Sequence, residues 1–230
     1  MTDLQRCFND VIARIQQAEH ACNRQGDVQL LAVSKTKPDS MIREAYSLGQ
    51  KHFGENYLQE ALDKIAQLSD LTDLCWHFIG PIQSNKTRDI ASHFHWVHSV
   101  DRLKIARRLS EQRPEGLPPL NICLQVNISG EASKSGITLA ELPDLAREIA
   151  SLPALKLRGL MAIPAPETDP SKQRAPFHTL ATAFRQLNQE SDLQMDTLSM
   201  GMTGDLEAAI YEGATMVRIG TALFGARNYL

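Results

Sequence analysis

Short apolar runs alternate with amphipathic segments along the chain. Eight runs have the length of buried strands, and the segments between them carry apolar residues at helical spacing. The pattern predicts strands near 29–34, 52–54, 75–80, 95–99, 120–127, 156–162, 196–199 and 215–219. It predicts helices over 3–24, 39–49, 57–69, 84–93, 139–151, 173–190 and 204–213, another after residue 101, and a short terminal turn.

Two of these helices have recognisable start signals. Asp101 can accept hydrogen bonds from the unpaired amides of the first turn that follows it. Thr138 and Glu141 have the spacing of a capping box, which predicts that the helix over 139–151 opens there.

The order of the units indicates a parallel sheet, because each strand is followed by a helix or helical turn. Eight such units in about 200 residues match the strand count and lower size range of a (β/α)8 barrel. An open doubly wound sheet is the alternative, but the Gly-x-Gly-x-x-Gly fingerprint is absent after the first strand. We therefore expect an α/β fold in which residues 1–230 form a single (β/α)8 TIM-type barrel with an extra N-terminal helix and no second domain.

Composition narrows the classes of partner. The chain has 230 residues and a net charge of −3, which gives no general attraction to nucleic acid or acidic membranes. A basic stretch over 86–113 is interrupted by acidic residues and lacks stacking aromatics, so we interpret it as two solvated helix faces. There is no apolar signal core and no run of ~18 apolar residues. We expect a cytoplasmic protein that binds neither nucleic acid nor membrane.

The cysteines and histidines form no recognisable metal motif. Four cysteines are scattered without a Cys-x-x-Cys pair, so neither a disulfide framework nor a zinc site is expected. His93, His95 and His98 are close in sequence, but His95 and His98 would face opposite sides of one strand. His77, inside a predicted strand, is interpreted as a hydrogen-bonded core histidine. We expect no bound metal.

Lys35 is the leading candidate for chemistry. It follows the apolar run Leu30–Val33 and precedes Thr36-Lys37-Pro38, where the strand must end. Partial removal from water at that position favours the neutral amine, whose lone pair can attack an aldehyde. The alternative is a lysine whose charged end reaches past a strand edge into solvent.

Polar residues gather where the predicted strands end, which is the end of a barrel that carries its chemistry. Ser-Met-Gly-Met-Thr (199–203) follows the seventh strand, and Gly220–Thr221 follows the eighth. Glycine lets amides approach phosphate oxygens closely and hydroxyls add donors, so the two loops together predict a phosphate site. Arg218, near the end of the eighth strand, either supports the barrel or faces a heteroaromatic nitrogen.

Eight short motifs follow one another along nearly the whole chain. They are Ala-Val-Ser-Lys-Thr-Lys-Pro (32–38), Phe-Gly-Glu-Asn-Tyr (53–57), Trp-His-Phe-Ile-Gly (76–80), Gln-Ser-Asn-Lys (83–86), Ser-Lys-Ser-Gly (133–136), Arg-Gly-Leu-Met-Ala-Ile (158–163), Leu-Ser-Met-Gly-Met (198–202) and Met-Val-Arg-Ile-Gly-Thr-Ala-Leu-Phe-Gly (216–225). In this order they resemble the pyridoxal phosphate homeostasis protein family, most of all its proteobacterial members. Together they are highly specific, whereas one alone would not be.

The resemblance implies a barrel like the N-terminal domain of bacterial alanine racemases, with pyridoxal 5′-phosphate (PLP) as cofactor. It implies an internal aldimine between PLP and Lys35. It also implies that the cofactor phosphate lies against Ser199, Gly220 and Thr221, with Arg218 near the pyridine nitrogen.

Other positions follow from the same resemblance. Asn56 and Met161 match residues that line the cofactor, and Lys134 matches a lysine linked to a secondary site or to cofactor transfer. One departure is visible at Thr203, in Thr-Gly-Asp, where many members have Ser-x-Asp. Threonine keeps the hydroxyl, but a contact specific to serine is in doubt.

Two functional classes fit this resemblance. PLP is an electron sink for amino-acid chemistry, and an arginine beside its nitrogen cannot take up the proton that strengthens the sink. Racemisation needs acid–base groups on both faces of the cofactor, which racemases of this kind take from a second domain and a partner subunit. The chain ends soon after the predicted eighth strand, so we expect no such domain and an open barrel mouth.

We therefore expect a carrier or regulator in intracellular PLP homeostasis and not an enzyme. A PLP-dependent amino-acid racemase is the alternative, and a barrel that binds a phosphorylated sugar is a third hypothesis. A monomer is expected, with PLP itself and PLP-requiring apo-enzymes as partners.

Overall fold

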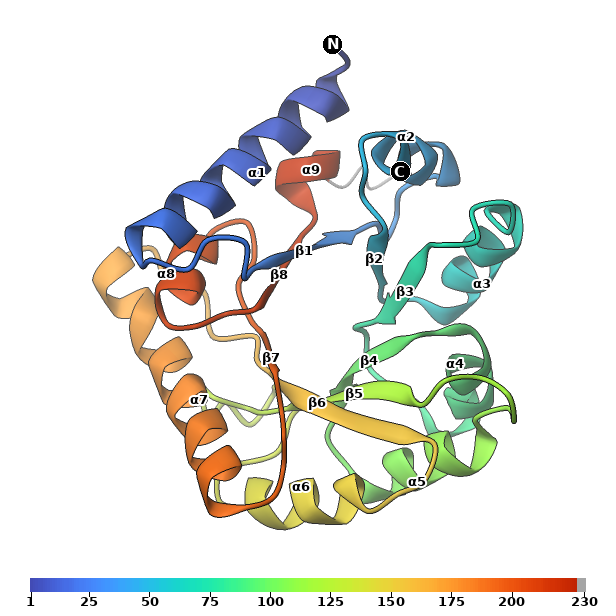
Figure 1. Cartoon of the computed structure of the whole chain (residues 1–230), viewed down its shortest axis with the longest axis vertical. Coiled ribbons are helices and arrows are strands. Elements are labelled where there is room, and N and C mark those ends of the chain that lie inside the picture. The colour runs from blue at the N-terminus through green and yellow to red at the C-terminus, as the bar shows by residue number, and fades with distance from the viewer. Residues whose placement is uncertain (227–230) are drawn as a thin grey trace.

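The eight apolar runs pair in parallel and close into a barrel in the order β1 to β8 (Figure 1). The computed structural model describes residues 1–226. The strands are β1 (Gln29–Val33), β2 (His52–Glu55), β3 (Cys75–Phe78), β4 (Trp96–Val100), β5 (Leu120–Gln125), β6 (Leu155–Met161), β7 (Thr197–Ser199) and β8 (Met216–Ile219). The predicted (β/α)8 barrel is confirmed, and the open-sheet alternative is wrong because β1 pairs with β8 from Gln29↔Met216 to Ala32↔Ile219.

Helices surround the barrel (Figure 1). They are α1 (Asp3–Ala21), α2 (Asp39–Ser47), α3 (Leu58–Gln67), the 3₁₀ turn η1 (Ser84–Lys86), α4 (Thr87–His93), α5 (Leu103–Gln112), α6 (Leu142–Ala150), α7 (Pro170–Glu190), α8 (Leu206–Tyr211) and α9 (Thr221–Phe224). The extra helix α1 buries Leu4, Val11 and Ile15, as its amphipathic pattern predicts. It lies alongside α8 and α9, where Arg14 donates to Glu207 at 2.7 Å. Over residues 1–226, none of the helices is both long and apolar enough to cross a bilayer.

Alternate strand residues separate into two buried layers, because successive side chains point to opposite faces of a strand. Leu30 and Ala32 belong to the large apolar layer between the strands and the surrounding helices. Leu31 faces the other way, into the barrel. There it joins a small interior cluster with Trp96, Cys123, Met161 and Met216. The interior is therefore a filled core, as expected for a barrel of eight strands.

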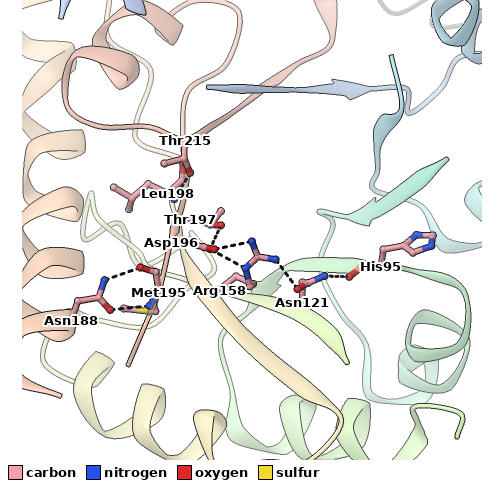
Figure 2. A network of polar contacts seen from close by, with 9 residues as sticks. All are labelled: His95, Asn121, Arg158, Asn188, Met195, Asp196, Thr197, Leu198 and Thr215. Atoms are coloured by element: carbon pink, nitrogen blue, oxygen red, sulfur yellow. Dashed lines mark hydrogen bonds and ion pairs between the residues drawn. The ribbon is translucent and has the colours of Figure 1, made fainter. Parts of the chain in front are cut away.

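The amino-terminal rim is held by a polar network across four strands (Figure 2). Arg158 of β6 donates to both carboxylate oxygens of Asp196, each at 2.9 Å, just before β7 begins. It also donates to Asn121 of β5 at 3.0 Å, and Asn121 donates to the carbonyl of His95 at 3.0 Å, just before β4. These bonds fix strand positions at the end of the barrel that serves stability.

The two predicted helix starts differ in outcome. The Asp101 prediction is wrong, because no side chain caps α5 and the Asp101 carboxylate instead accepts from the Gly136 amide at 3.1 Å. The reciprocal bonds of the capping box form, from the Thr138 amide to Glu141 at 2.9 Å and from the Glu141 amide to the Thr138 hydroxyl at 3.3 Å. They close a turn, and α6 begins only after it, at Leu142.

Candidate functional site

The carboxyl ends of the strands surround a cavity of about 300 Å³. Five of the predicted site residues line it, namely Lys35, Asn56, Arg218, Gly220 and Thr221. Apolar side chains and the β7–α8 loop complete the wall, through Val33, Ile79, Ile163, Met202, Thr203 and Gly204. A larger hollow of about 410 Å³ lies between α6 and α7, outside the barrel and away from the strand ends. The cavity lined by the predicted site residues, although the smaller of the two, is therefore the candidate functional site.

Lys35 stands at the turn where β1 ends. The strand ladder continues through the Ser34 amide, which donates to the Gly54 carbonyl at 3.0 Å. Thr36 then takes a left-handed conformation with φ of 64°, which non-glycine residues seldom adopt. This reversal stops the strand and leaves Lys35 partly buried at the cavity wall. The predicted position of Lys35 at the mouth is confirmed.

A buried ion network, which the sequence reasoning missed, holds that turn. The Lys64 ammonium donates to Glu55 at 2.8 Å, to Glu60 at 2.5 Å and to the Ser34 carbonyl at 2.8 Å. Glu60 also accepts from the Thr36 amide at 2.6 Å, and the Ser34 hydroxyl donates to Glu55 at 2.6 Å. The two residues that flank Lys35 in the turn, Ser34 and Thr36, are thus tied to α3 and β2. The available signal was the Glu60–Lys64 spacing of four on one helix face.

Burial raises the pKa of the Glu55 carboxyl, and the neighbouring Lys64 opposes that rise. The second oxygen of Glu55 is buried without a hydrogen-bond partner among the described residues. A charged carboxylate at Glu55 is therefore stabilised mainly by Lys64, with the Ser34 hydroxyl as a second donor.

Arg218 is a buried cation at the floor of the cavity. Its side chain donates to the Ser199 hydroxyl at 2.8 Å and to the Ala162 carbonyl at 2.9 Å. Within residues 1–226, no carboxylate lies at ion-pairing distance from it. Burial lowers the pKa of Arg218 to about 10, so the guanidinium stays charged near neutrality. Arg218 therefore supports the barrel and also lines the cavity, and its position beside a heteroaromatic nitrogen stays a prediction.

Ser199 and Met161 lie deeper than the other predicted residues. Both are fully buried, and neither lines the cavity. The Ser199 hydroxyl bonds to Arg218 and to Nδ1 of His98, the latter at 2.7 Å. Met161 packs in the interior cluster beneath the mouth. A direct contact of Ser199 with a phosphate stays a prediction, whereas its contact with Arg218 is part of the structure.

A chain of histidines continues from Ser199 through the barrel interior. His98 Nε2 lies 2.8 Å from His77 Nδ1, and His77 Nε2 lies 2.9 Å from His52 Nδ1. Burial lowers the pKa of His98 to about 3 and that of His77 well below its ordinary value, so both are neutral. The interpretation of His77 as a hydrogen-bonded core histidine is confirmed. His95 is exposed just before β4 begins, whereas His98 is buried within β4.

The loops after β7 and β8 form the other side of the cavity. Gly201 has φ of 100°, and a Cβ there would lie 2.7 Å from Cβ of Ala209, so only glycine fits this turn. The Thr203 hydroxyl accepts from the Ala222 amide at 3.3 Å, which joins the two loops. Gly220 and Thr221 open α9, where the first amides have no partner within the helix. The two loops therefore bring backbone amides and threonine hydroxyls to the same side of the cavity.

Asn56 offers an unsatisfied acceptor at the cavity wall. Its Oδ1 is buried without a hydrogen-bond partner among residues 1–226. Gly80 permits its position, because a Cβ there would lie 2.2 Å from the Asn56 carbonyl oxygen. An unpaired buried acceptor is costly, so a donor supplied by a ligand would be stabilised here.

Lys134 lies at a neighbouring cavity of about 260 Å³, which shares Asn56, Ile79 and Ile163 with the first. Its ammonium is 3.2 Å from a Glu131 carboxylate oxygen and 3.5 Å from the Ile163 carbonyl. Lys134 therefore adjoins the candidate site without lining the cavity that contains Lys35.

The fold and the strand-end lysine define a barrel of the alanine racemase N-terminal class. The family model "Alanine racemase, N-terminal domain" matches residues 9–228. An alanine racemase from Clostridium difficile has the same fold, with a TM-score of 0.72 and 15% identity over 97% of this chain and 56% of that chain.

Closer relatives narrow the class. The pyridoxal phosphate homeostasis protein of Pseudomonas aeruginosa is 65% identical over 95% of this chain and 94% of its own length. The Escherichia coli protein of the same name is 55% identical over 100% and 99%. PipY of Synechococcus elongatus, solved with PLP bound, gives a TM-score of 0.81 and 41% identity over 92% of this chain and 100% of that chain. This chain belongs to the pyridoxal phosphate homeostasis protein family.

Proposed function

We propose that this chain binds PLP at the barrel mouth, with Lys35 as the amine that captures its aldehyde. The observation that supports this most is that Lys35, Arg218, Gly220 and Thr221 line one cavity from two neighbouring strand ends. We further propose a role as a carrier or regulator in PLP homeostasis, and not as an enzyme. The names of the relatives and the PLP-bound state of PipY agree with this proposal.

The residues that line the cavity match the phosphate and the ring of PLP in turn. The cavity of about 300 Å³ has the size of a small-molecule site. Gly220, Thr221 and the loop containing Thr203 offer amides and hydroxyls to a phosphate. Arg218 offers donors to a ring nitrogen, and the unsatisfied Oδ1 of Asn56 offers an acceptor.

Two deeper residues complete the proposed set. Ser199 orients Arg218 through a bond of 2.8 Å and belongs to the site in that capacity. Met161 packs in the interior cluster beneath the cavity. When bound, the cofactor supplies an electron sink. The protein's part would be to hold the phosphate, present one amine and offer a charged guanidinium at the cavity wall.

The cavity has few groups for proton transfer. Racemisation needs an acid and a base on opposite faces of the bound substrate. Among the described residues that line the cavity, Lys35 is the one amine, and Arg218 keeps its charge because its pKa is about 10. The other described lining groups are apolar side chains, hydroxyls, an amide and glycines. This supports binding and release over racemisation. Cytoplasmic location, a monomeric state and delivery to PLP-requiring apo-enzymes belong to the same proposal.

A titration of PLP into the purified protein tests this function. We expect a yellow protein with saturable visible absorbance, lost in Lys35→Ala and kept in Lys37→Ala, the neighbouring lysine of the same turn. A protein that stays colourless with added PLP contradicts the proposal. Formation of a D-amino acid from L-alanine or other L-amino acids, dependent on Lys35, would favour the racemase. Tight binding of sugar phosphates without a visible band would favour the third hypothesis.

A further inference from the structure

Three potential metal ligands converge at the amino-terminal end of the barrel, opposite the candidate cofactor cavity. His52 and Cys75 are register partners at the first positions of β2 and β3. Cys75 and His77 are two residues apart on β3, so their side chains lie on the same face. One potential ligand atom from each of the three residues lies within 4.8 Å of the other two. His77 Nε2 is 2.9 Å from His52 Nδ1 and 3.5 Å from Cys75 Sγ. The sequence predicted no metal site because these ligands come from two strands and form no spaced motif.

We propose that His52, Cys75 and His77 bind a borderline-soft divalent cation, with Zn²⁺ as the best match. With Zn–N of about 2.05 Å and Zn–S of about 2.3 Å, tetrahedral coordination places two nitrogens about 3.3 Å apart and a nitrogen and sulfur about 3.6 Å apart. The His77 Nε2 to Cys75 Sγ distance is 3.5 Å, which already fits. The His52 Nδ1 to His77 Nε2 distance is 2.9 Å, so these two atoms would separate by about 0.4 Å.

The neighbours of His77 supply the support that a metal-binding imidazole needs. A ligating histidine must donate its other ring N–H to a fixed acceptor. His77 Nδ1 lies 2.8 Å from His98 Nε2, which can accept that proton, and His98 Nδ1 lies 2.7 Å from the Ser199 hydroxyl oxygen. Trp96 stacks on the His77 ring at 5.3 Å between centroids and 13° between planes. The orientation of the ligand is thus fixed by packing and by hydrogen bonds.

The exposure and the charge of the three ligands suit a metal site whose fourth position is occupied by water. His52 and Cys75 are partly exposed, so an ion and a water can reach the cluster. Binding replaces the hydrogen bond between the two imidazoles, so the His52 proton moves from Nδ1 to Nε2 through solvent, and the Cys75 thiol releases its proton to solvent. Two neutral imidazoles and one thiolate leave a divalent ion with one net positive charge. Three protein ligands with water in the fourth position is the arrangement of zinc sites that stay open.

Cobalt substitution tests the site, because tetrahedral Co²⁺ shows visible ligand-field bands and thiolate ligation adds a charge-transfer band in the near ultraviolet. We expect saturable binding of one equivalent of Co²⁺, displaced by Zn²⁺. Cys75→Ser should remove the charge-transfer band. Both Cys75→Ser and His52→Gln should weaken Zn²⁺ binding on the order of 10- to 100-fold. Cys7→Ser and His93→Gln are matched controls outside the cluster and should change neither result.

Buried His77 is left unchanged, since its loss could unfold the barrel. Circular dichroism of each variant establishes that it is folded before metal is added. Absence of saturable Co²⁺ binding overturns the proposal, as does binding that survives both Cys75→Ser and His52→Gln. Lys35→Ala should keep full metal binding, so this site and the proposed PLP site fail or succeed independently.

Discussion

Replacing Lys64 with methionine tests whether the buried ion network stabilises the turn that carries Lys35. The Lys64 and Glu55 side chains are 6% and 0% exposed, with 2.8 Å between charged atoms. Methionine keeps the apolar stem but leaves Glu55 as a buried carboxylate without its cation. Breaking such a pair from one side costs about 3–5 kcal/mol of unfolding free energy. For a chain of this size, that corresponds to a fall in melting temperature of roughly 6–20 °C.

The loss should depend on pH in a defined direction. Burial already raises the pKa of Glu55, and removing Lys64 removes an interaction that lowers it. A carboxyl whose pKa is raised by folding contributes stability at low pH, and that contribution is lost as pH rises through the folded-state pKa. The deficit of Lys64→Met should therefore shrink as pH falls from neutrality toward the ordinary glutamate pKa of 4.5.

Urea unfolding at several pH values measures the effect. The control is Lys51→Met, which breaks an exposed pair with Asp73 whose side chains are 53% and 45% exposed. That variant should lose little stability, with little pH dependence, because water and salt screen an exposed ion pair. The double variant Glu55→Gln/Lys64→Met should regain part of the loss, because no buried charge remains unpaired. A loss below about 1 kcal/mol at neutral pH, or one that does not shrink in acid, would refute the reasoning.

Three further predictions concern single sites. Gly80→Ala places a Cβ 2.2 Å from the Asn56 carbonyl oxygen, so it should destabilise by about 1–3 kcal/mol or more in thermal unfolding and weaken PLP binding; a neutral effect on both contradicts the packing argument. Arg218→Met should weaken PLP affinity at least tenfold in an equilibrium titration. An unchanged affinity would mean that the guanidinium does not contribute to PLP binding. Burial raises the pKa of Cys75 to about 12, so alkylation of this thiol followed by mass spectrometry should be slow at neutral pH and faster as pH rises; rapid labelling of the folded protein contradicts that.

The barrel could be predicted from sequence because its signals are local. Each strand is a short apolar run, and the alternation with helices fixes parallel pairing. The strand-end rule then places Lys35, Arg218 and Gly220–Thr221 at one mouth, and these residues line one cavity in the structure. Helix starts were predicted less accurately. Asp101 has a suitable cap sequence, but its carboxylate accepts from Gly136 and does not cap α5. Thr138 forms its bonds with Glu141, but they close a turn that precedes α6.

Contacts inside the barrel could not be predicted in the same way. The chain from Ser199 through His98 and His77 to His52 depends on register across strands that are distant in sequence. The ion network around Lys64 depends on how far α3 is rotated against β2, which no local pattern specifies. Ser199 is an example, because the bonds of its hydroxyl to Arg218 and His98 could not be read from its motif.

Borohydride reduction of the PLP-loaded protein, followed by peptide mapping, tests the central claim most directly. Reduction makes the bond between a lysine and the cofactor aldehyde permanent, so the modified residue can be identified by mass. We predict one pyridoxyl-phosphate adduct, located on Lys35. An adduct on another lysine, a spread over several surface lysines, or no adduct at saturating PLP would contradict the account.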